Sequence, residues 1–132
     1  MKQQRPSIDQ WLEEGKAHES APEIGMYLTH IGIVRRTAKA TARLGEDAPP
    51  VNGMEFSYDR TKLEAAVEAA RAMEGIHYVK VWLNEGRLEV GDEIMQVLIG
   101  GDIRPRVIDA LQALVGRIKN ECVEETELYE VD

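Results

Sequence analysis

Basic side chains at the two ends of the last predicted helix are the residues whose types and positions most favour chemistry. Arg104 and Arg106 stand at its start, and Lys119 closes it. The start of a helix offers free N–H donors and a partial positive charge, so arginines there are unfavourable unless an anion binds. The alternative is that the arginines point to water or pair with Asp102 and Asp109, since surface ion pairs are common.

The spacing of these cations limits what they can do together. Arg104 and Lys119 are 15 positions apart, which is roughly 22 Å along a straight helix. They cannot share one small anion site within one chain, but they could across a symmetric dimer in which helix start meets helix end. Arg35 and Arg36 end a strand-like segment, and adjacent strand residues face opposite ways, so only one can point into a given site. Ordinary strand-end and helix-end charges are the alternative for Arg35 and Lys119.

Other site chemistries are not supported by local patterns. His18, His30 and His77 fall in three different predicted elements, and no Cys/His spacing resembles a zinc motif, so we expect no metal site and no bound cofactor. The Gly-Gly-Asp at 100–102 is not a phosphate loop, because no Gly-Lys-Ser/Thr follows it. A Ser-His-Asp or Cys-His apparatus stays open, although no local signature favours one.

The composition is that of an ordinary globular domain, with 43% apolar and 30% charged residues among 132. This length predicts a single domain spanning 1–132. No apolar run approaches the roughly 18 residues that cross a bilayer, and no secretory signal is visible. The single cysteine, Cys122, allows no disulfide framework, so we expect a cytoplasmic protein.

The formal charge of −8 is concentrated at the C-terminus. Residues 121–132 hold six acids and no base, so the rest of the chain carries 18 acids (24 − 6) against 16 bases. We therefore predict an acidic, solvated C-terminal tail at 121–132. The near balance elsewhere argues against nucleic-acid binding, which requires a basic excess.

Hydrophobic periodicity predicts an α+β fold, in which a mixed or antiparallel sheet is covered by two main helices. Residues 1–24 should form a short helix, capped at Ser7, and a loop. Asp59 is expected to cap a second helix, and Gly32 to mark a bulge, while residues 94–99 look buried on both faces. The predicted helices are 7–14, 59–74 and 104–119, the strands 25–37, 54–58, 76–83 and 91–100, and a mobile loop 38–53. One apolar stripe follows the last helix, made by Val107, Ile108, Leu111, Leu114, Val115 and Ile118.

Three motifs in order make the chain resemble the large, catalytic subunit of molybdopterin synthase, from about residue 25 to 120. GMYLTHIGIVR (25–35) resembles that family's opening strand, which ends in Gly-x-Val-Arg. EGRLEVGDEIMQVLIGGDIR (85–104) resembles its Gly-x-Leu-x-x-Gly-Asp-x-x-Val stretch, which leads to a His-Arg pair. VIDALQALVGRIK (107–119) follows in register with a helix that ends in a catalytic lysine.

The resemblance implies an α/β hammerhead fold and a homodimeric large subunit. The family inserts two sulfurs into cyclic pyranopterin monophosphate to make the dithiolene of molybdopterin. The sulfur arrives as a thiocarboxylate on the C-terminal Gly-Gly of a ubiquitin-like small subunit, whose tail enters a pocket of the large subunit. Basic groups would hold the phosphate and the tail through charge-assisted contacts.

Carried over by position, Arg35 matches the family's strand-end arginine, Arg104 the arginine of the His-Arg pair, and Lys119 the helix-end lysine. The resemblance implies substrate or tail binding by Arg35 and Arg104. It implies proton-handling or nucleophile-like chemistry for Lys119. The chain departs from the family at two positions, since Ile103 stands for the histidine and Thr126 for a second catalytic lysine.

Acidic residues also replace a basic wall of the family. Glu124 and Glu125 would repel a phosphate and a thiocarboxylate if they lay near the pocket. Three functions are therefore open: a synthase large subunit that works with Lys119 alone, a non-catalytic dimeric relative that keeps the fold and an anion pocket, or an enzyme of unrelated chemistry. An acidic tail folded away from the pocket would favour the first, and a tail that plugs it the second.

Overall fold

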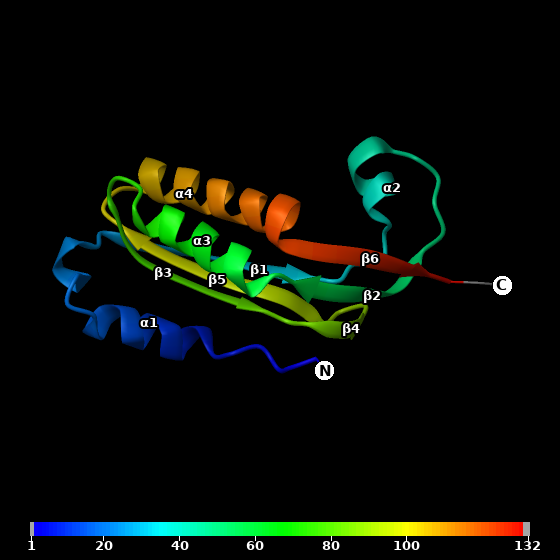
Figure 1. Cartoon of the computed structure of the whole chain (residues 1–132), viewed down its shortest axis with the longest axis horizontal. Coiled ribbons are helices and arrows are strands. Elements are labelled where there is room, and N and C mark those ends of the chain that lie inside the picture. Colours follow the sequence, from blue (N-terminus) through cyan, green and yellow to red (C-terminus); the bar gives the residue numbers. More distant parts are fainter. Residues whose placement is uncertain (1, 131–132) are drawn as a thin grey trace.

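The computed structural model describes residues 2–130, which form two three-stranded antiparallel sheets with helices around them (Figure 1). One sheet has the order β1-β5-β3 and the other β4-β2-β6. The strands are β1 (Met26–Ile33), β2 (Val51–Tyr58), β3 (Ile76–Leu83), β4 (Gly86–Glu89), β5 (Glu93–Gly101) and β6 (Val123–Tyr129). The helical segments are α1 (Ile8–Ala17), the 3₁₀ turn η1 (Ala21–Glu23), α2 (Lys39–Leu44), α3 (Arg60–Arg71), α4 (Arg104–Arg117) and the π-helical turn η2 (Ile118–Cys122). The predicted α+β class is confirmed, with two antiparallel sheets in place of one. None of the helices within 2–130 is long and apolar enough to cross a membrane.

Strand β5 is the centre of the first sheet. It pairs with β1 on one side, where Leu28 lies opposite Ile99, and with β3 on the other, where Val79 lies opposite Ile99. Helices α3 and α4 cover one face of this sheet, and α1 lies against the other (Figure 1). Residues 94–99 are therefore buried on both faces, as predicted. Each large apolar side chain among them contributes about 2 kcal/mol to stability by its burial.

Local sequence signals at two helix starts and in β1 are confirmed. The Ser7 hydroxyl accepts a hydrogen bond from the backbone N–H of Gln10 (3.2 Å), and the Asp59 carboxylate from that of Lys62 (3.0 Å). These caps satisfy N–H groups that have no partner within their helices. The register between β1 and β5 shifts directly after Gly32. A bulge there bends the strand end away from the ladder.

The segment 38–53 is not the mobile loop that its composition predicts. It contains α2, which ends at Gly45 in a left-handed cap with a φ of 69°, and β2 begins within it at Val51. Ala38 and Val51 are almost fully buried. Ala38 and Val51 therefore anchor the segment on the core, whereas residues 42–47 are exposed and Gly45 forms the left-handed cap of α2.

The acidic C-terminus is also not the solvated tail that its charge predicts. Strand β6 pairs antiparallel with β2 from Tyr58↔Val123 to Val51↔Tyr129. Its side chains alternate, so Glu125 is partly buried while Glu124 is exposed. The charge count missed this period of two, which directs every second side chain to one face. Val131 and Asp132, which belong to the predicted tail, lie outside the described residues.

Helix α4 begins at Arg104, where predicted, with a proline in its first turn. Its buried residues include Val107, Ala110 and Leu114, whereas Ile108, expected in the apolar stripe, is 38% exposed. Residue 108 is turned by about 100° from Val107 around the helix, and this places it at the margin of the buried face. The stripe is therefore narrower than predicted, and an apolar side chain is left on the surface near the start of α4.

Candidate functional site

A cavity of about 580 Å³ opens where the two sheets meet. Its volume is in the range of sites that take small organic ligands. The walls come from both sheets, from α2 and from the π-helical turn after α4. The lining residues are His30, Gly32, Ile33, Val34, Arg35, Lys39, Arg43, Met54, Ile94, Lys119, Glu125, Thr126, Glu127 and Tyr129.

Two of the three residues singled out by the sequence, Arg35 and Lys119, lie in this cavity together. Arg35 follows the bulged end of β1. Lys119 lies in η2, directly after Ile118, whose side chain is fully buried. A π-helical turn changes the direction of the side chains that follow it. The buried isoleucine fixes the turn, and Lys119 is thereby held at the cavity wall.

The neighbouring Arg36 lines a different hollow, together with Arg87 and Glu130. This confirms the prediction that only one of the two adjacent arginines can point into a given site. The backbone of Arg36 also joins the two parts of the fold, because its carbonyl accepts a hydrogen bond from the Val51 N–H (2.7 Å). Arg35 is thus placed by a fixed backbone rather than by a free loop.

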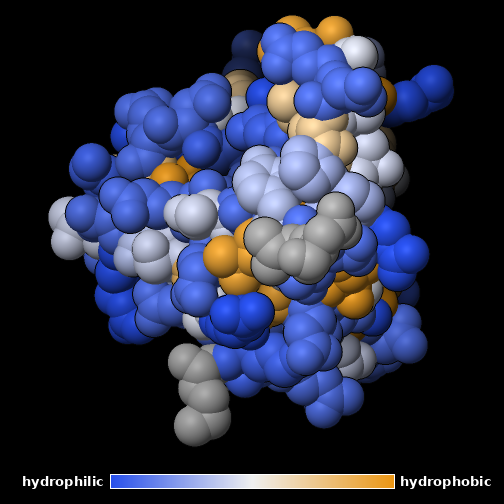
Figure 2. All heavy atoms as spheres, turned by 90° about the vertical axis from the view of Figure 1, so that its right-hand side faces the viewer, coloured by the Kyte–Doolittle hydropathy of each residue, from blue (hydrophilic) through white to orange (hydrophobic). Residues whose placement is uncertain are grey.

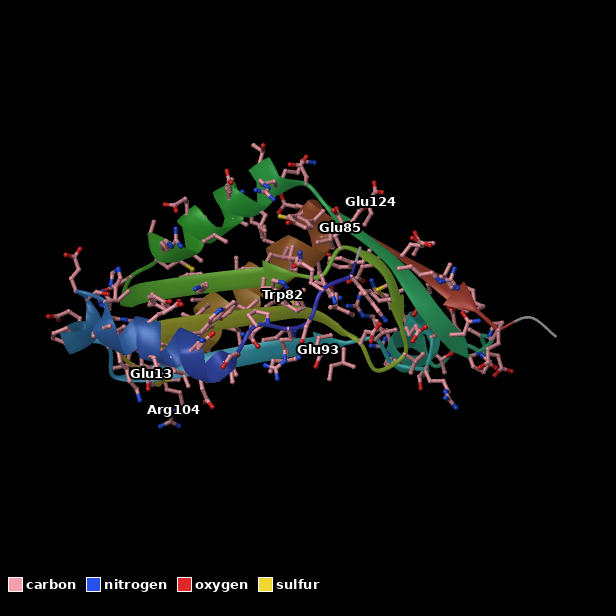
Figure 3. All side chains as sticks on the ribbon, turned by 90° about the horizontal axis from the view of Figure 1, so that it is seen from below. Glu13, Trp82, Glu85, Glu93, Arg104 and Glu124 are labelled. Atoms are coloured by element: carbon pink, nitrogen blue, oxygen red, sulfur yellow. The ribbon has the colours of Figure 1, made fainter. Side chains whose placement is uncertain are left out.

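Arg104 lies at the opposite end of the first sheet. The pairing of Met26 with Gly101 places the start of α4 beside the start of β1, whereas Arg35 follows the other end of that strand. Figure 3 shows the Arg104 side chain pointing away from the body of the molecule. Within residues 2–130 it takes part in no ion pair. The separation of Arg104 from Lys119 that the sequence predicts is therefore present in the chain.

Arg106 forms ion pairs with neighbouring acids, which is the alternative to anion binding stated above for the arginines at this helix start. Its guanidinium pairs with Asp102 (2.6 Å) and with Glu74 (3.0 Å). Asp102 also accepts a hydrogen bond from the Ile103 backbone N–H (2.7 Å), in the residue that directly precedes α4. Arg106 is a structural residue of this end, and its expected partner Asp109 is not used.

Both acids of the cavity wall are bound to other groups of the protein. Glu125 forms an ion pair with Lys119. Glu127 accepts hydrogen bonds from the backbone N–H of Lys39 (2.9 Å) and from the Tyr129 hydroxyl (2.9 Å). The first of these bonds caps α2, which has no side-chain cap of its own. Strand β6 therefore lines the cavity without filling it.

Three cations at the cavity, Arg35, Lys39 and Arg43, form no ion pair within residues 2–130. The charges of Lys119 and Glu125 cancel, and Glu127 offsets one of the three cations. The cavity wall therefore keeps a net positive charge. Glu124, which the sequence placed near a pocket as a repelling group, does not line the cavity and lies on the outer surface (Figure 3). The site is thus a positive region on an acidic protein, and it suits an anion.

The sequence matches the MoaE protein family over residues 2–121. The chain belongs to the MoaE family. This confirms the resemblance in its motifs and the role that it implies, in molybdenum cofactor biosynthesis. A search of curated proteins finds no significant match to the sequence.

Solved MoaE-type structures share the fold along nearly the whole chain. Molybdopterin synthase from Staphylococcus aureus aligns with a TM-score of 0.73 at 16% identity, over 98% of this chain and 90% of that one. The MoaE protein of Burkholderia ambifaria gives 0.69 at 19%, over 99% and 89%. A complex of subunits 1 and 2 of molybdopterin-converting factor from Helicobacter pylori gives 0.62 at 16%, over 98% and 88%. The low identities agree with a divergent member of the MoaE family.

Ile103 and Thr126, which the resemblance aligns with a histidine and a second lysine, lie in different places. Thr126 lines the cavity, so a lysine at this position would fall in the site. Ile103 lies at the other end of α4, where its side chain is 50% exposed. Within residues 2–130, no three His, Cys, Asp or Glu side chains gather in a way that could hold a metal ion.

Sequence reasoning missed His30 as a site residue of this MoaE chain. Its side chain is partly buried and lines the cavity with Lys119. Burial lowers the pKa of His30 below its ordinary value, and the positive charge of Lys119 lowers it further. The available signal was its spacing of two from Gly32, which places both on one face of the strand that leads to Arg35.

Proposed function

We propose that this chain is the large subunit of a molybdopterin synthase. Sulfur would pass from a thiocarboxylate on the Gly-Gly tail of a ubiquitin-like small subunit to cyclic pyranopterin monophosphate, and molybdopterin dithiolene would form. Membership of the MoaE family supports this, and the similar Helicobacter pylori structure is a complex of two subunits. We place the reaction in the cytoplasm, where the buried Cys122 would stay a free thiol.

One observation carries the proposal: Arg35 and Lys119 come from distant parts of the chain to one cavity, which Lys39 and Arg43 also line without an ion pair within residues 2–130. Arg35 would bind the phosphate or the small-subunit tail, with Lys39 and Arg43 adding positive charge at the mouth of the cavity. Lys119 would stabilise negative charge and donate a proton near the reacting sulfur. The cavity volume of about 580 Å³ accommodates a pterin-sized molecule.

We further propose a homodimer that brings Arg104 to the cavity of the partner subunit. The exposed large apolar side chains within residues 2–130 form two groups, Ile103 and Ile108 at the start of α4, and Ile33, Leu44 and Tyr129 around the cavity. Figure 2 faces the end that bears β2, β6 and α2, and shows apolar patches among hydrophilic atoms there. A twofold axis that pairs the two groups would cover both.

A second candidate function is a non-catalytic dimeric relative that binds an anion. The ion pair between Lys119 and Glu125 favours it, because a lysine held by a carboxylate is less available to a substrate. Thr126 in the cavity favours it too, since the second lysine of the family is missing. The two candidates agree about anion binding and differ about turnover.

Reconstitution separates these candidates. The purified protein would be mixed with a thiocarboxylated small subunit and cyclic pyranopterin monophosphate, and molybdopterin would be measured. We expect product from the wild type, a loss of about a hundredfold or more in Lys119→Ala, and no loss in Lys16→Ala, an exposed lysine of α1. Binding of the small subunit without product would instead establish the non-catalytic relative. The absence of both binding and product would refute the synthase proposal.

A further inference from the structure

We infer that His30 is the base that accepts the proton of the attacking water in the second half of the sulfur transfer. This inference rests on the proposed function, because it assigns a step of that reaction to a residue of the same cavity. His30 is a titratable side chain in the wall beside Lys119, and the roles proposed for Arg35 and Lys119 leave it unused.

The chemistry requires such a base. Once the thiocarboxylate sulfur has bonded to a substrate carbon, the tail and the substrate are joined through an acyl thioester. A water oxygen must then bond to the carbonyl carbon while the carbon–sulfur bond of the acyl group breaks. The electron pair stays on sulfur, which remains on the substrate as a thiolate, and the tail leaves as a carboxylic acid. The water gives up one proton, and a neutral imidazole can take it.

The backbone around His30 leaves space for this water. His30 and Gly32 share one face of β1, and both line the cavity. A Cβ added at Gly32 would lie 3.7 Å from the His30 Nε2 atom and 3.3 Å from the Met95 Cγ atom. Any longer side chain at this position would fill the space beside Nε2, so the glycine keeps that nitrogen open to the cavity.

The protonation state of the ring also suits the role. Burial and the Lys119 charge both lower the pKa of His30, so the neutral ring is the dominant form at pH 7. Within residues 2–130 the ring makes no hydrogen bond, whereas the His18 ring is bonded to Ser20. The charged groups that share the cavity with the ring, from every element around it, are Arg35, Lys39, Arg43, Lys119, Glu125 and Glu127.

Lys119 is the less suitable base of the two. Its ammonium is in an ion pair with Glu125, and an ammonium has no lone pair with which to take a proton. The same positive charge can stabilise the oxygen of the carbonyl under attack and the departing thiolate. The cavity therefore separates two tasks, with Lys119 stabilising negative charge and His30 accepting the proton.

His30→Asn and His30→Gln, which keep a polar side chain but cannot accept the proton, test the inference in the reconstituted synthase. We expect kcat to fall about a hundredfold or more with little change in KM. The acyl thioester between small subunit and substrate should accumulate and be detected by mass spectrometry, added imidazole should restore part of the rate, and the acid limb of the kcat–pH profile should disappear. His77→Asn, on β3 outside the cavity, should behave as the wild type.

Three results would overturn the inference while leaving the proposed function intact. These are an unchanged kcat, an unchanged pH profile, or a loss of activity without accumulated thioester and without rescue by imidazole. Phosphate binding equal to that of the wild type would show that the variants keep the folded cavity. A wild-type protein that forms no molybdopterin would refute the proposed function, and this inference with it.

Discussion

The two ends of helix α4 both carry cations, but they present them in opposite ways. At its C-terminal end, Lys119 lines a cavity with Arg35. At its N-terminal end, Arg104 projects outward from the surface, beside the exposed Ile103 (Figure 3). One end is concave, and the other projects from the surface. About 20 Å of helix separates them, so a chain cannot bring both to one small ligand.

The backbone explains why the ends differ. The cavity end is built from irregular segments, namely the bulge after Gly32, the short helix α2 and the π-helical turn η2. Such features redirect side chains away from the regular surface of a sheet or helix. The other end is a regular helix start, with Pro105 in the first turn. Concave sites arise where regular structure is interrupted, and here the interruptions lie at one end only.

Mixing two inactive variants gives the largest expected effect and tests whether the ends meet across a dimer. Lys119→Ala and Arg104→Ala should each lower molybdopterin formation about a hundredfold or more. In a shared-site dimer, half of the randomly mixed dimers contain one subunit of each variant, and each such dimer has one site with both residues intact. Activity should therefore recover to about a quarter of the wild-type value, measured after unfolding and refolding the variants together.

The control mixes Lys119→Ala with Arg35→Ala, because Arg35 and Lys119 line the same cavity of one chain. A mixed dimer of these two variants has no intact site, so activity should stay at the level of the single variants. Recovery in the control, or none in the test mixture, would show that Arg104 does not complete the cavity of a partner subunit.

A charged side chain at position 103 should weaken the proposed contact between the two subunits. Ile103→Asp would place a carboxylate in the proposed interface, which should raise the dissociation constant of the dimer by about 30-fold, or about 2 kcal/mol. Sedimentation velocity over a concentration series measures this shift. Ala69→Asp on the exposed side of α3 is the matched control and should leave the dimer unchanged. A dimer that survives Ile103→Asp with wild-type affinity would place the interface elsewhere.

Much of the scaffold at both ends could be predicted because local rules decide it. The caps at Ser7 and Asp59, the bulge after Gly32 and the buried strand at 94–99 follow from signals a few residues long. The start of α4 at Arg104 follows from apolar spacing and a proline. The three motifs of the family resemblance pointed to Arg35 and Lys119, and the structure places these two residues in one cavity.

The parts that could not be predicted depend on pairing between distant segments. Strand β6 forms because β2 offers it an unpaired edge, and no count of acids in 121–132 can reveal that edge. Helix α2 has no side-chain cap within its own segment, since its start is capped by Glu127 of β6. His30 can be assigned to the site only once the fold is known, because η2 brings Lys119 to the same cavity wall. Most of the missing information concerned the cavity end.

Neutralising Glu125 should free Lys119 for an anion, and so increase the difference between the cavity end of α4 and its other end. Glu125→Gln removes the carboxylate that pairs with this lysine and one negative charge from the cavity. Inorganic phosphate should then bind about fivefold more tightly, which corresponds to about 1 kcal/mol of lost repulsion. Isothermal titration calorimetry measures the change. Glu124→Gln alters the neighbouring residue, which lies on the outer surface, and equal gains in both variants would contradict a specific role for the ion pair.

The smallest expected effect is the dependence of stability on pH that comes from His30. Its pKa in the folded protein lies below the ordinary value of 6.5, because burial and the Lys119 charge oppose protonation. The unfolded chain therefore binds this proton more readily, and the contribution of the neutral ring to stability is present above pH 6.5 and is lost as the pH falls below it.

His30→Gln removes the titrating group. Between pH 7.5 and pH 5.5, its free energy of unfolding in urea should fall less than that of the wild type, at one protein concentration. His18→Gln, an exposed substitution after α1, should follow the wild type. Parallel losses in the wild type and His30→Gln would mean that the ring is as solvated at the cavity end as a histidine at the open surface, which would remove the contrast between the two environments.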